Sequence, residues 1–322
     1  MRGHTKTLLI GAALLVVLIS PSSAAQRDSR EPIIDVHLHA IPWTPKIGQA
    51  ETPQDFTKGW EETRQWLDRY NIVLGLVSGS NEITQHWKRL APERIQAGVF
   101  FPCDHGEVAN SRGRKCFGDG ASVPDLGWLR TEIKSGRVAF LGEVTSQYLG
   151  LKPSDPILEP YFTLAEELDI PVGIHMGLGP WGAIYPDGFC GQMPCAPGYR
   201  AALSDPLLLE DVLVRHPRLR IWVMHAGWPM KDQMVSLLFS HPQVYADIAV
   251  LGIEKVMPRR VFHDYLCTLV DHGFGKRVMW GSDFGGSAFQ ESIEAVESAP
   301  CLTAEQKRDI FYNNAARFLH LK

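Results

Sequence analysis

Short runs of apolar residues alternate along the chain with longer segments that carry helical periodicity. Most runs are rich in Val, Ile or Phe, which is typical of strands that are covered on both faces. We predict eight such strands, which are Ile33–His39, Ile72–Ser78, Ile95–Phe101, Ala139–Val144, Pro171–Met176, Arg220–His225, Val244–Val250 and Val278–Asp283.

The segments between these runs space their apolar residues as amphipathic helices do. Examples are the stripes Trp60/Thr63/Trp66/Leu67/Tyr70 and Leu164/Ala165/Leu168, and the segment Pro206 to Val214. A capping box at Thr303-Ala304-Glu305-Gln306 predicts a closing helix, whose apolar face is Ile310, Phe311, Ala315, Phe318 and Leu319.

Eightfold alternation of strand and helix predicts the α/β class and a (β/α)8 TIM barrel. A doubly wound open sheet is the competing fold. No Gly-x-Gly-x-x-Gly follows the first strand, which counts against the dinucleotide-binding version of that sheet.

Ionisable side chains stand at the ends of five predicted strands. They are His37 and His39 on strand one, Glu143 on strand four, His175 on strand five, His225 on strand six and Asp283 on strand eight. Positions i and i+2 of a strand share a face, and the C-terminal ends of barrel strands meet at one mouth. Buried ionisable groups are unfavourable unless paired or ligated, and imidazole is a common zinc ligand. We therefore predict a shared metal site at this mouth.

Each residue alone has a simpler interpretation, as a core histidine, an ion-paired glutamate or a helix-capping aspartate. Their joint placement favours the metal. The other histidines fall on helical or terminal segments or precede prolines, except His105, which follows strand three and could reach the mouth from its loop.

Residues 1–25 are typical of a secretory signal peptide. Arg2 and Lys6 precede an apolar stretch, Leu8 to Ile19, that is too short to span a bilayer comfortably, and Ser23-Ala24-Ala25 offers small residues for cleavage. An uncleaved N-terminal anchor is the alternative. We expect residues 26–322 to form one domain that is exported, periplasmic or secreted, with no membrane association after cleavage.

The net charge and the cysteine content limit the kinds of binding partner and the cellular compartment that we expect. The formal charge of −4 becomes −6 without Arg2 and Lys6, and no Lys/Arg block stands out, so we expect a small-molecule substrate and no nucleic acid. Homo-oligomerisation stays open.

Export permits disulfides, and short spacing predicts the pairs Cys190–Cys195 and Cys103–Cys116. Cys267 and Cys301 remain, either as a pair or as thiols.

The segment after strand five, Leu178 to Tyr199, contains Trp181, Tyr185 and the cysteine pair Cys190/Cys195. It predicts either an aromatic substrate wall over the mouth or a braced surface loop. Trp228 and Phe284 directly follow site residues and could also line a pocket for a partly apolar substrate.

The strand-end residues resemble those of the amidohydrolase superfamily, and its amidohydrolase-related branch that includes aminocarboxymuconate-semialdehyde decarboxylase. The resemblance covers nearly all of the chain after the leader, and Asn313-Asn314-Ala315-Ala316-Arg317 resembles the closing helix of that branch. It implies that His37, His39, His175 and Asp283 hold a principal divalent metal, with zinc expected, and that His225 acts on the substrate or binds a second metal. Glu143 falls where TatD-like nucleases bridge two metals. The decarboxylase branch lacks that acid as a ligand, so one or two metals remain open.

These observations predict a metal-dependent hydrolase that cleaves an amide, ester, lactone or similar bond in a small organic substrate. A divalent metal lowers the pKa of its bound water from about 16 towards about 7. Asp283 would accept the proton of that water, and His225 would stabilise the oxyanion or hold the leaving group. The alternatives are a non-oxidative decarboxylase with the same ligands and a catalytically silent metal-binding protein.

Overall fold

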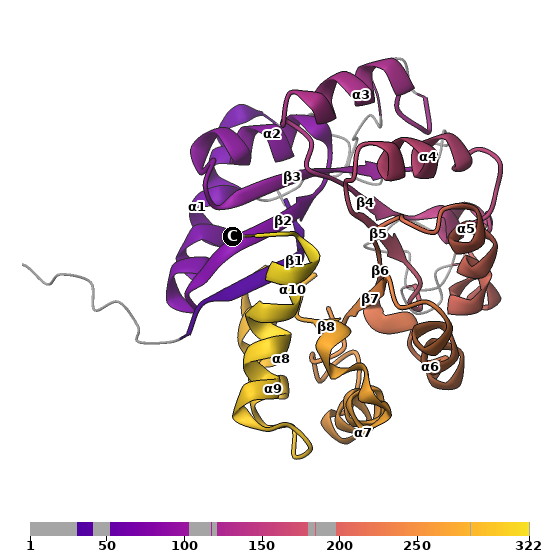
Figure 1. The fold of residues 1–322 in the computed structure, drawn as a ribbon. Helices are drawn as coiled ribbons and strands as arrows, with labels where there is room; N and C mark the ends of the chain where they lie inside the picture. Colours follow the sequence, from indigo (N-terminus) through magenta and orange to yellow (C-terminus); the bar gives the residue numbers. More distant parts are fainter. Residues whose placement is uncertain are drawn as a thin grey trace, which may run out of the picture.

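The computed structural model describes residues 31–40, 52–102, 117, 121–179, 184, 198–283 and 285–321. Within these residues, eight parallel strands follow one another in sequence order around a nearly closed barrel (Figure 1). The strands are β1 (Ile33–His39), β2 (Ile72–Ser78), β3 (Ile95–Phe101), β4 (Phe140–Val144), β5 (Val172–His175), β6 (Ile221–Met224), β7 (Val244–Asp247) and β8 (Val278–Met279). The predicted (β/α)8 barrel is confirmed, and the open sheet is excluded.

Strands β1 to β3 have the predicted bounds, whereas β4 to β8 are shorter than predicted by one to four residues at an end. The backbone leaves the ladder where the polar residues begin. His225 and Ala226 adopt φ of 57° and 48° in a 3-10 turn, and Asp283 adopts a φ of 66°. A left-handed residue cannot continue a strand, so the apolar runs extend beyond the regular ladder.

Helices surround the barrel (Figure 1), and most of them pack buried apolar side chains against it. They are α1 (Pro53–Arg69), α2 (Asn81–Leu90), α3 (Leu126–Lys134), α4 (Glu159–Glu167), α5 (Glu210–Arg215), α6 (Lys231–Ser240), α7 (Arg259–Leu269), α8 (Ser287–Glu297), α9 (Ala304–Arg308) and α10 (Asn314–Phe318). The predicted capping box is confirmed, because Thr303 and Gln306 satisfy each other's backbone amides. The segment from Pro206 divides into a 3-10 turn, Pro206–Leu209, and α5.

The barrel closes between β1 and the chain after β8 through a few specific hydrogen bonds. The Asp283 amide donates to the His37 carbonyl at 2.7 Å, and the Val36 amide donates to the Trp280 carbonyl at 3.2 Å. The buried Asp35 carboxylate accepts from the Ser282 amide at 3.0 Å and from its hydroxyl at 2.6 Å. We call this junction the β1–β8 seam.

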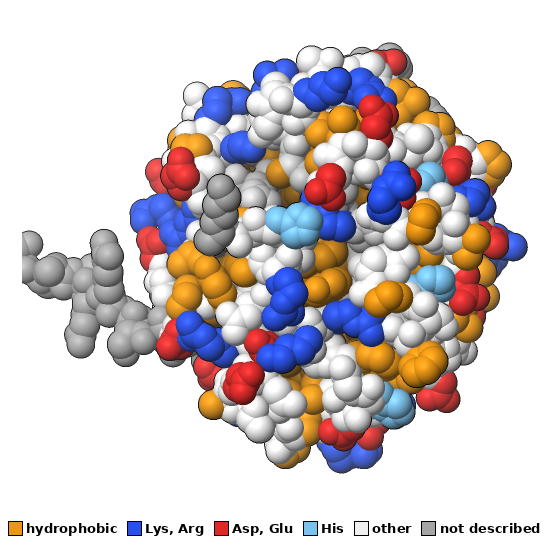
Figure 2. Space-filling view, in the orientation of Figure 1, with side chains coloured by type: hydrophobic (Ala, Val, Ile, Leu, Met, Phe, Trp, Pro, Cys, Tyr) orange, Lys and Arg blue, Asp and Glu red, His pale blue; other side chains and the backbone are white. Residues whose placement is uncertain are grey.

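The C-terminal helix α10 packs across the N-terminal end of the barrel, which faces the viewer in Figure 1. Ala315 and Phe318 join the interior cluster of Ile34, Val36, Leu76, Phe140, Trp222, Met224 and Met279. On this face, acidic and basic side chains are interspersed with apolar groups (Figure 2). Among the described residues, no helix has both the length and the apolar character needed to cross a bilayer.

A disulfide joins Cys267 in α7 to Cys301 beyond α8, which settles the pairing that the sequence left open. The predicted pairs Cys190–Cys195 and Cys103–Cys116 lie outside the described residues, as does the predicted signal peptide at 1–25. These remain predictions.

Candidate metal centre

The structure brings together the ionisable side chains from all five predicted strand ends. Glu143, at the end of β4, lies in the middle. Its Oε2 atom is 3.2 Å from His39 Nε2 and 3.9 Å from His37 Nε2. Asp283 Oδ1 lies on the same side, 3.2 Å from His39 Nε2 and 3.7 Å from His37 Nε2. These four side chains form the first half of the centre.

The second half of the centre lies on the other carboxylate oxygen of Glu143. Glu143 Oε1 accepts a hydrogen bond from His175 Nδ1, and it is 3.8 Å from His225 Nε2. His225 Nε2 and His175 Nδ1 are 3.1 Å apart. The side chains are nearly buried, with exposed fractions of 5% for both histidines and 7% for Glu143.

The donor set fits a divalent cation. Three overlapping groups each place three ligand atoms within 4.8 Å of one another: His37/His225/Asp283, His37/His39/Glu143 and Glu143/His175/His225. His37 Nε2 is buried and lacks a hydrogen-bond partner among the described residues, although it faces two carboxylates. A buried nitrogen lone pair without a partner is unfavourable unless an ion binds there. Neutral imidazoles and carboxylates are ligands that zinc and related ions accept.

Protons balance the charge of this centre when no cation is bound. Burial lowers the pKa of His39, but hydrogen bonds to Asp283 and Glu143 outweigh burial and raise it to about 10. The pKa of His225 is raised to about 9 in the same way, mainly by the hydrogen bond to Glu143. Burial raises the pKa of Glu143, yet the charge of His175 and bonds from the histidines hold it well below the usual range. A divalent cation would displace these protons.

Asp247, the last residue of β7, orients the histidines from behind, and the sequence analysis missed it. Its Oδ2 accepts from His37 Nδ1 and Trp222 Nε1, each at 3.0 Å. Its Oδ1 accepts from the amides of His225 and Ala249, each at 3.0 Å. Because His37 Nδ1 donates, the lone pair of His37 lies on Nε2 and points at the centre, the arrangement typical of metal-binding histidines. A signal was present, since a lone carboxylate inside an apolar run needs buried partners.

Asp35 is a second buried carboxylate that the sequence analysis passed over. It accepts from the His37 amide at 3.0 Å in addition to Ser282, so it ties the first ligand strand to the β1–β8 seam. Burial raises the pKa of Asp35 to about 7, against the lowering effect of the hydrogen bonds from Ser282 and His37.

The structure describes the predicted wall after β5 at its two ends and, between them, at residue 184 alone. Gly179 donates its amide to the Tyr199 hydroxyl at 2.9 Å. Tyr148, from the turn after β4, packs its ring 4.9 Å from that of His175 and 5.8 Å from that of Tyr199. Trp228 is partly buried against the core. Among the other predicted mouth residues, the described ranges do not include Trp181, Tyr185, Phe284 or His105.

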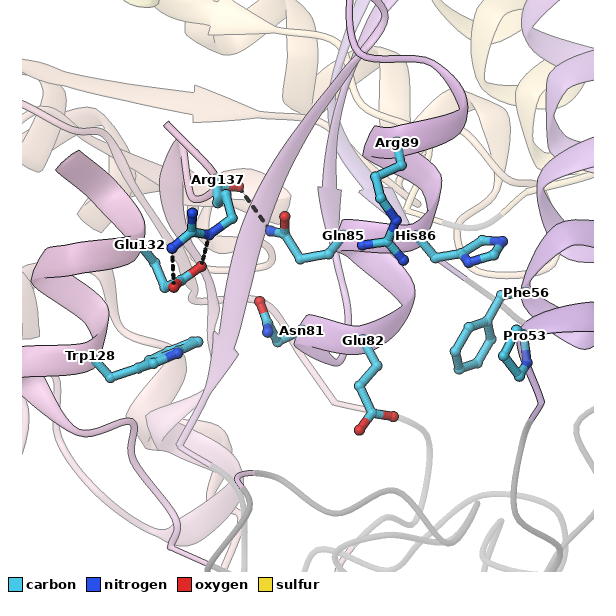
Figure 3. A pocket seen from close by; sticks show the side chains of 10 residues that line it. All are labelled: Pro53, Phe56, Asn81, Glu82, Gln85, His86, Arg89, Trp128, Glu132 and Arg137. Atoms are coloured by element: carbon cyan, nitrogen blue, oxygen red, sulfur yellow. Dashed lines mark hydrogen bonds and ion pairs between the residues drawn. The ribbon is translucent and has the colours of Figure 1, made fainter. Parts of the chain in front are cut away.

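A separate hollow of about 480 Å³ lies between α1, α2 and α3 (Figure 3). Phe56 and Trp128 border it, and Arg137 forms a two-bond ion pair with Glu132 on one wall. None of the six side chains of the candidate metal centre lines this hollow.

Comparison with known proteins defines the class. The family model for amidohydrolases matches residues 34–321, so the chain belongs to the amidohydrolase family. The resemblance seen in the sequence is thereby confirmed. No curated protein matches the chain significantly.

Solved structures share the fold at low sequence identity. A 5-carboxyvanillate decarboxylase from Sphingomonas paucimobilis is 14% identical with a TM-score of 0.57, over 90% of this chain and 99% of that one. A 4-oxalomesaconate hydratase from Rhodopseudomonas palustris is 15% identical with a TM-score of 0.57, over 89% and 95%. A probable 2-pyrone-4,6-dicarboxylic acid hydrolase from Acinetobacter baumannii is 15% identical with a TM-score of 0.57, over 90% and 99%. At these identities the likeness shows the fold alone.

Proposed function

We propose that this protein is a metal-dependent hydrolase with two adjacent divalent ions, zinc being our choice. The observation that carries the proposal is the position of Glu143. Its Oε2 faces His39 and its Oε1 faces His175, so the carboxylate stands between two sets of ligands. In this position Glu143 would be a ligand of both ions of a two-metal hydrolytic site.

The tautomers of two histidines support these ligand sets. His37 Nδ1 donates to Asp247, and His225 Nδ1 donates to the Ala249 carbonyl at 3.1 Å. In the neutral form of each ring, the lone pair is therefore on Nε2, the atom that faces Glu143. His37, His39 and Asp283 would hold one ion together with Glu143, while His175 and His225 would hold the other.

When bound, the metal supplies a water whose pKa is lowered to about 7, so that it can attack as hydroxide at neutral pH. The protein supplies the proton acceptor. Burial opposes ionisation of Asp283, but the hydrogen bond from His39 and the charges of the histidines lower its pKa. The ionised Asp283 accepts the proton of the attacking water and returns it to the leaving group. The substrate bond would be an amide, ester, lactone or related acyl bond in a small organic molecule.

A non-oxidative decarboxylase is the second candidate, because one of the structural neighbours is a 5-carboxyvanillate decarboxylase. That reaction would need a single ion, which His37, His39, His175 and Asp283 would hold together, as the family resemblance implies. A silent metal-binding protein is the third candidate. We also propose that residues 1–25 are a leader that is removed on export, and that the binding partner is a small molecule.

Metal stoichiometry and product analysis on one preparation test the proposal. We expect about two equivalents of metal in the purified protein, and about one or fewer in Glu143→Gln and in the double variant His37→Ala/His39→Ala. His216→Asn changes a buried histidine that is bonded to Glu159 on α4, away from the centre, and serves as the matched control. Circular dichroism checks folding.

Turnover separates the three candidates. A panel of esters, lactones and amides is followed by proton release, and a panel of aromatic acids by release of carbon dioxide. Hydrolysis that depends on the metal supports the proposal. Carbon dioxide release without hydrolysis would refute it in favour of the decarboxylase, and full metal occupancy without any turnover would favour the silent protein.

A further inference from the structure

Tyr148 lies over the second half of the metal centre. It belongs to the 3-10 turn Ser146–Leu149, which directly follows β4, the strand that carries Glu143. Its hydroxyl is 3.3 Å from His175 Nε2. The Tyr199 ring packs against the phenol ring, and a Cβ atom added at Gly179 would lie 3.2 Å from Tyr148 Cε1. The phenol is therefore fixed at the mouth, and part of it remains accessible.

If His175 binds a metal ion, its tautomer determines which group donates in the hydrogen bond between His175 and Tyr148. His175 Nδ1 faces Glu143 and His225. If Nδ1 uses its lone pair for the metal, the ring proton must be on Nε2. His175 Nε2–H then donates, and the Tyr148 oxygen accepts.

The proton of the Tyr148 hydroxyl is then left for another acceptor. Within the described part of the chain, His175 Nε2 is the one hydrogen-bond partner of this hydroxyl. A hydroxyl group can both accept and donate, and the hydroxyls of tyrosines that pack inside proteins normally find a partner. Among the described residues this donor position is open, so a molecule that enters the mouth can accept the proton.

The same turn carries further polar atoms in need of partners. Ser146 Oγ and Gln147 Oε1 are buried and have no hydrogen-bond partner among the described residues. The Gln147 side chain is held in place, because its Nε2 atom donates to the Gly177 carbonyl at 2.7 Å. Unsatisfied buried polar atoms are rare in native proteins, and they collect where a ligand or water completes them.

We propose that Tyr148 is a catalytic residue whose hydroxyl donates a hydrogen bond to the substrate oxygen on which negative charge develops. The inference deepens the proposed function and rests on it, because it takes His175 Nδ1 as a ligand. In hydrolysis, the water oxygen bonds to the acyl carbon, and the carbonyl π pair moves to the carbonyl oxygen. The proton of the water passes to Asp283. Collapse re-forms the carbonyl, and the leaving group departs with that proton. Tyr148 keeps its own proton and stabilises the oxyanion.

Tyr148→Phe tests this role, because it removes the hydroxyl and keeps the ring packed on His175 and Tyr199. We expect kcat to fall by roughly 10²-fold or more, the scale for losing one oxyanion donor, with the KM and metal content close to those of the wild type. Tyr161→Phe is the matched control. Its hydroxyl donates to the Pro124 carbonyl away from the centre, so we expect turnover within about twofold of the wild type.

A binding measurement gives a readout that does not need turnover. Acetohydroxamate, which offers a carbonyl oxygen and a second metal-binding oxygen, is titrated into the metal-loaded proteins by calorimetry. We expect about tenfold weaker binding to Tyr148→Phe, a typical loss for one hydrogen bond to a charged oxygen. Acetohydroxamate affinity and, wherever turnover is found, kcat within twofold of the wild type would overturn the proposal.

Two other outcomes are distinguishable. If activity and metal content fall in parallel in Tyr148→Phe, Tyr148 acts only by holding His175, and the proposal is wrong. If the wild type releases carbon dioxide rather than hydrolysing any substrate, the proposed function fails. The comparison of Tyr148→Phe with Tyr161→Phe, made on carbon dioxide release and on acetohydroxamate binding, then decides the role of Tyr148 separately.

Discussion

Replacing Asp247 by asparagine tests whether the carboxylate behind His37 controls metal affinity. Asp247 accepts four hydrogen bonds, two on each oxygen. An asparagine can keep its single oxygen on the amides of His225 and Ala249. Its amide nitrogen then faces Trp222 Nε1–H and His37 Nδ1, and both of these groups donate in the native protein.

Two consequences follow, each with its own magnitude. The Trp222 donor is left unsatisfied in the core, which costs about 1–3 kcal/mol of unfolding free energy. His37 can relieve the second conflict by accepting at Nδ1, which moves its proton to Nε2 and removes the lone pair that faces the centre. Loss of a partner of this kind weakens metal binding by roughly 10- to 100-fold, or about 1.4–2.7 kcal/mol.

Competition with a chromophoric zinc chelator measures the affinity, and urea unfolding measures the stability of the metal-free protein. Asp309→Asn is the matched control, because Asp309 is a buried carboxylate that pairs with Lys276 away from the centre. We expect Asp309→Asn to lose stability and keep its metal affinity. A metal Kd within twofold of the wild type in folded Asp247→Asn would refute the assignment of Asp247.

Three further predictions concern the histidines. His225→Asn should lower the metal content by about one equivalent if two ions are bound; with a single ion it should leave the metal and reduce kcat by roughly 10²-fold, and normal values of both would make His225 structural. The pKa values of His39 and His225, about 10 and about 9, are raised, so their contribution to the stability of the metal-free protein is complete below about pH 6.5 and is lost as the pH rises through 9 and 10. Urea unfolding of metal-free protein between pH 6.5 and 10 checks this, and increasing stability over that range would contradict it. The same pKa values predict that metal binding releases protons at pH 7.5, which calorimetry in two buffers measures.

The sequence predicts the fold well because each strand is marked by a local run of apolar residues. The runs Ile33–His39, Ile72–Ser78 and Ile95–Phe101 are strands over their full predicted lengths. Strands β6, β7 and β8 end before the predicted His225, Val250 and Asp283, since apolarity continues after the backbone has left the ladder. Hydrophobic pattern reports burial, and these residues are buried whether or not they pair with a neighbouring strand.

The candidate site is predictable only as far as barrel geometry carries it. The rule that strand ends meet at one mouth is enough to bring His39, Glu143 and Asp283 together. The partner of His37 lies 210 positions away at Asp247, and no local pattern links the two. The sequence does not predict Tyr148 as a site residue for a related reason. Its contact with His175 depends on the path of the turn after β4 rather than on a residue motif.

Because of the β1–β8 seam, we expect assembly of the metal centre and closure of the barrel to be coupled. The backbone of His37 accepts from the backbone of Asp283, so two of the proposed ligands also join the first strand to the last. A cation that binds only the closed form would stabilise the closed ring by about 2.7 kcal/mol at a hundred times its Kd. The metal would then hold β1 and the chain after β8 together. Amide hydrogens at Val36 and Asp283 should exchange with solvent faster after chelation, while those inside the β2–β3 ladder keep their protection.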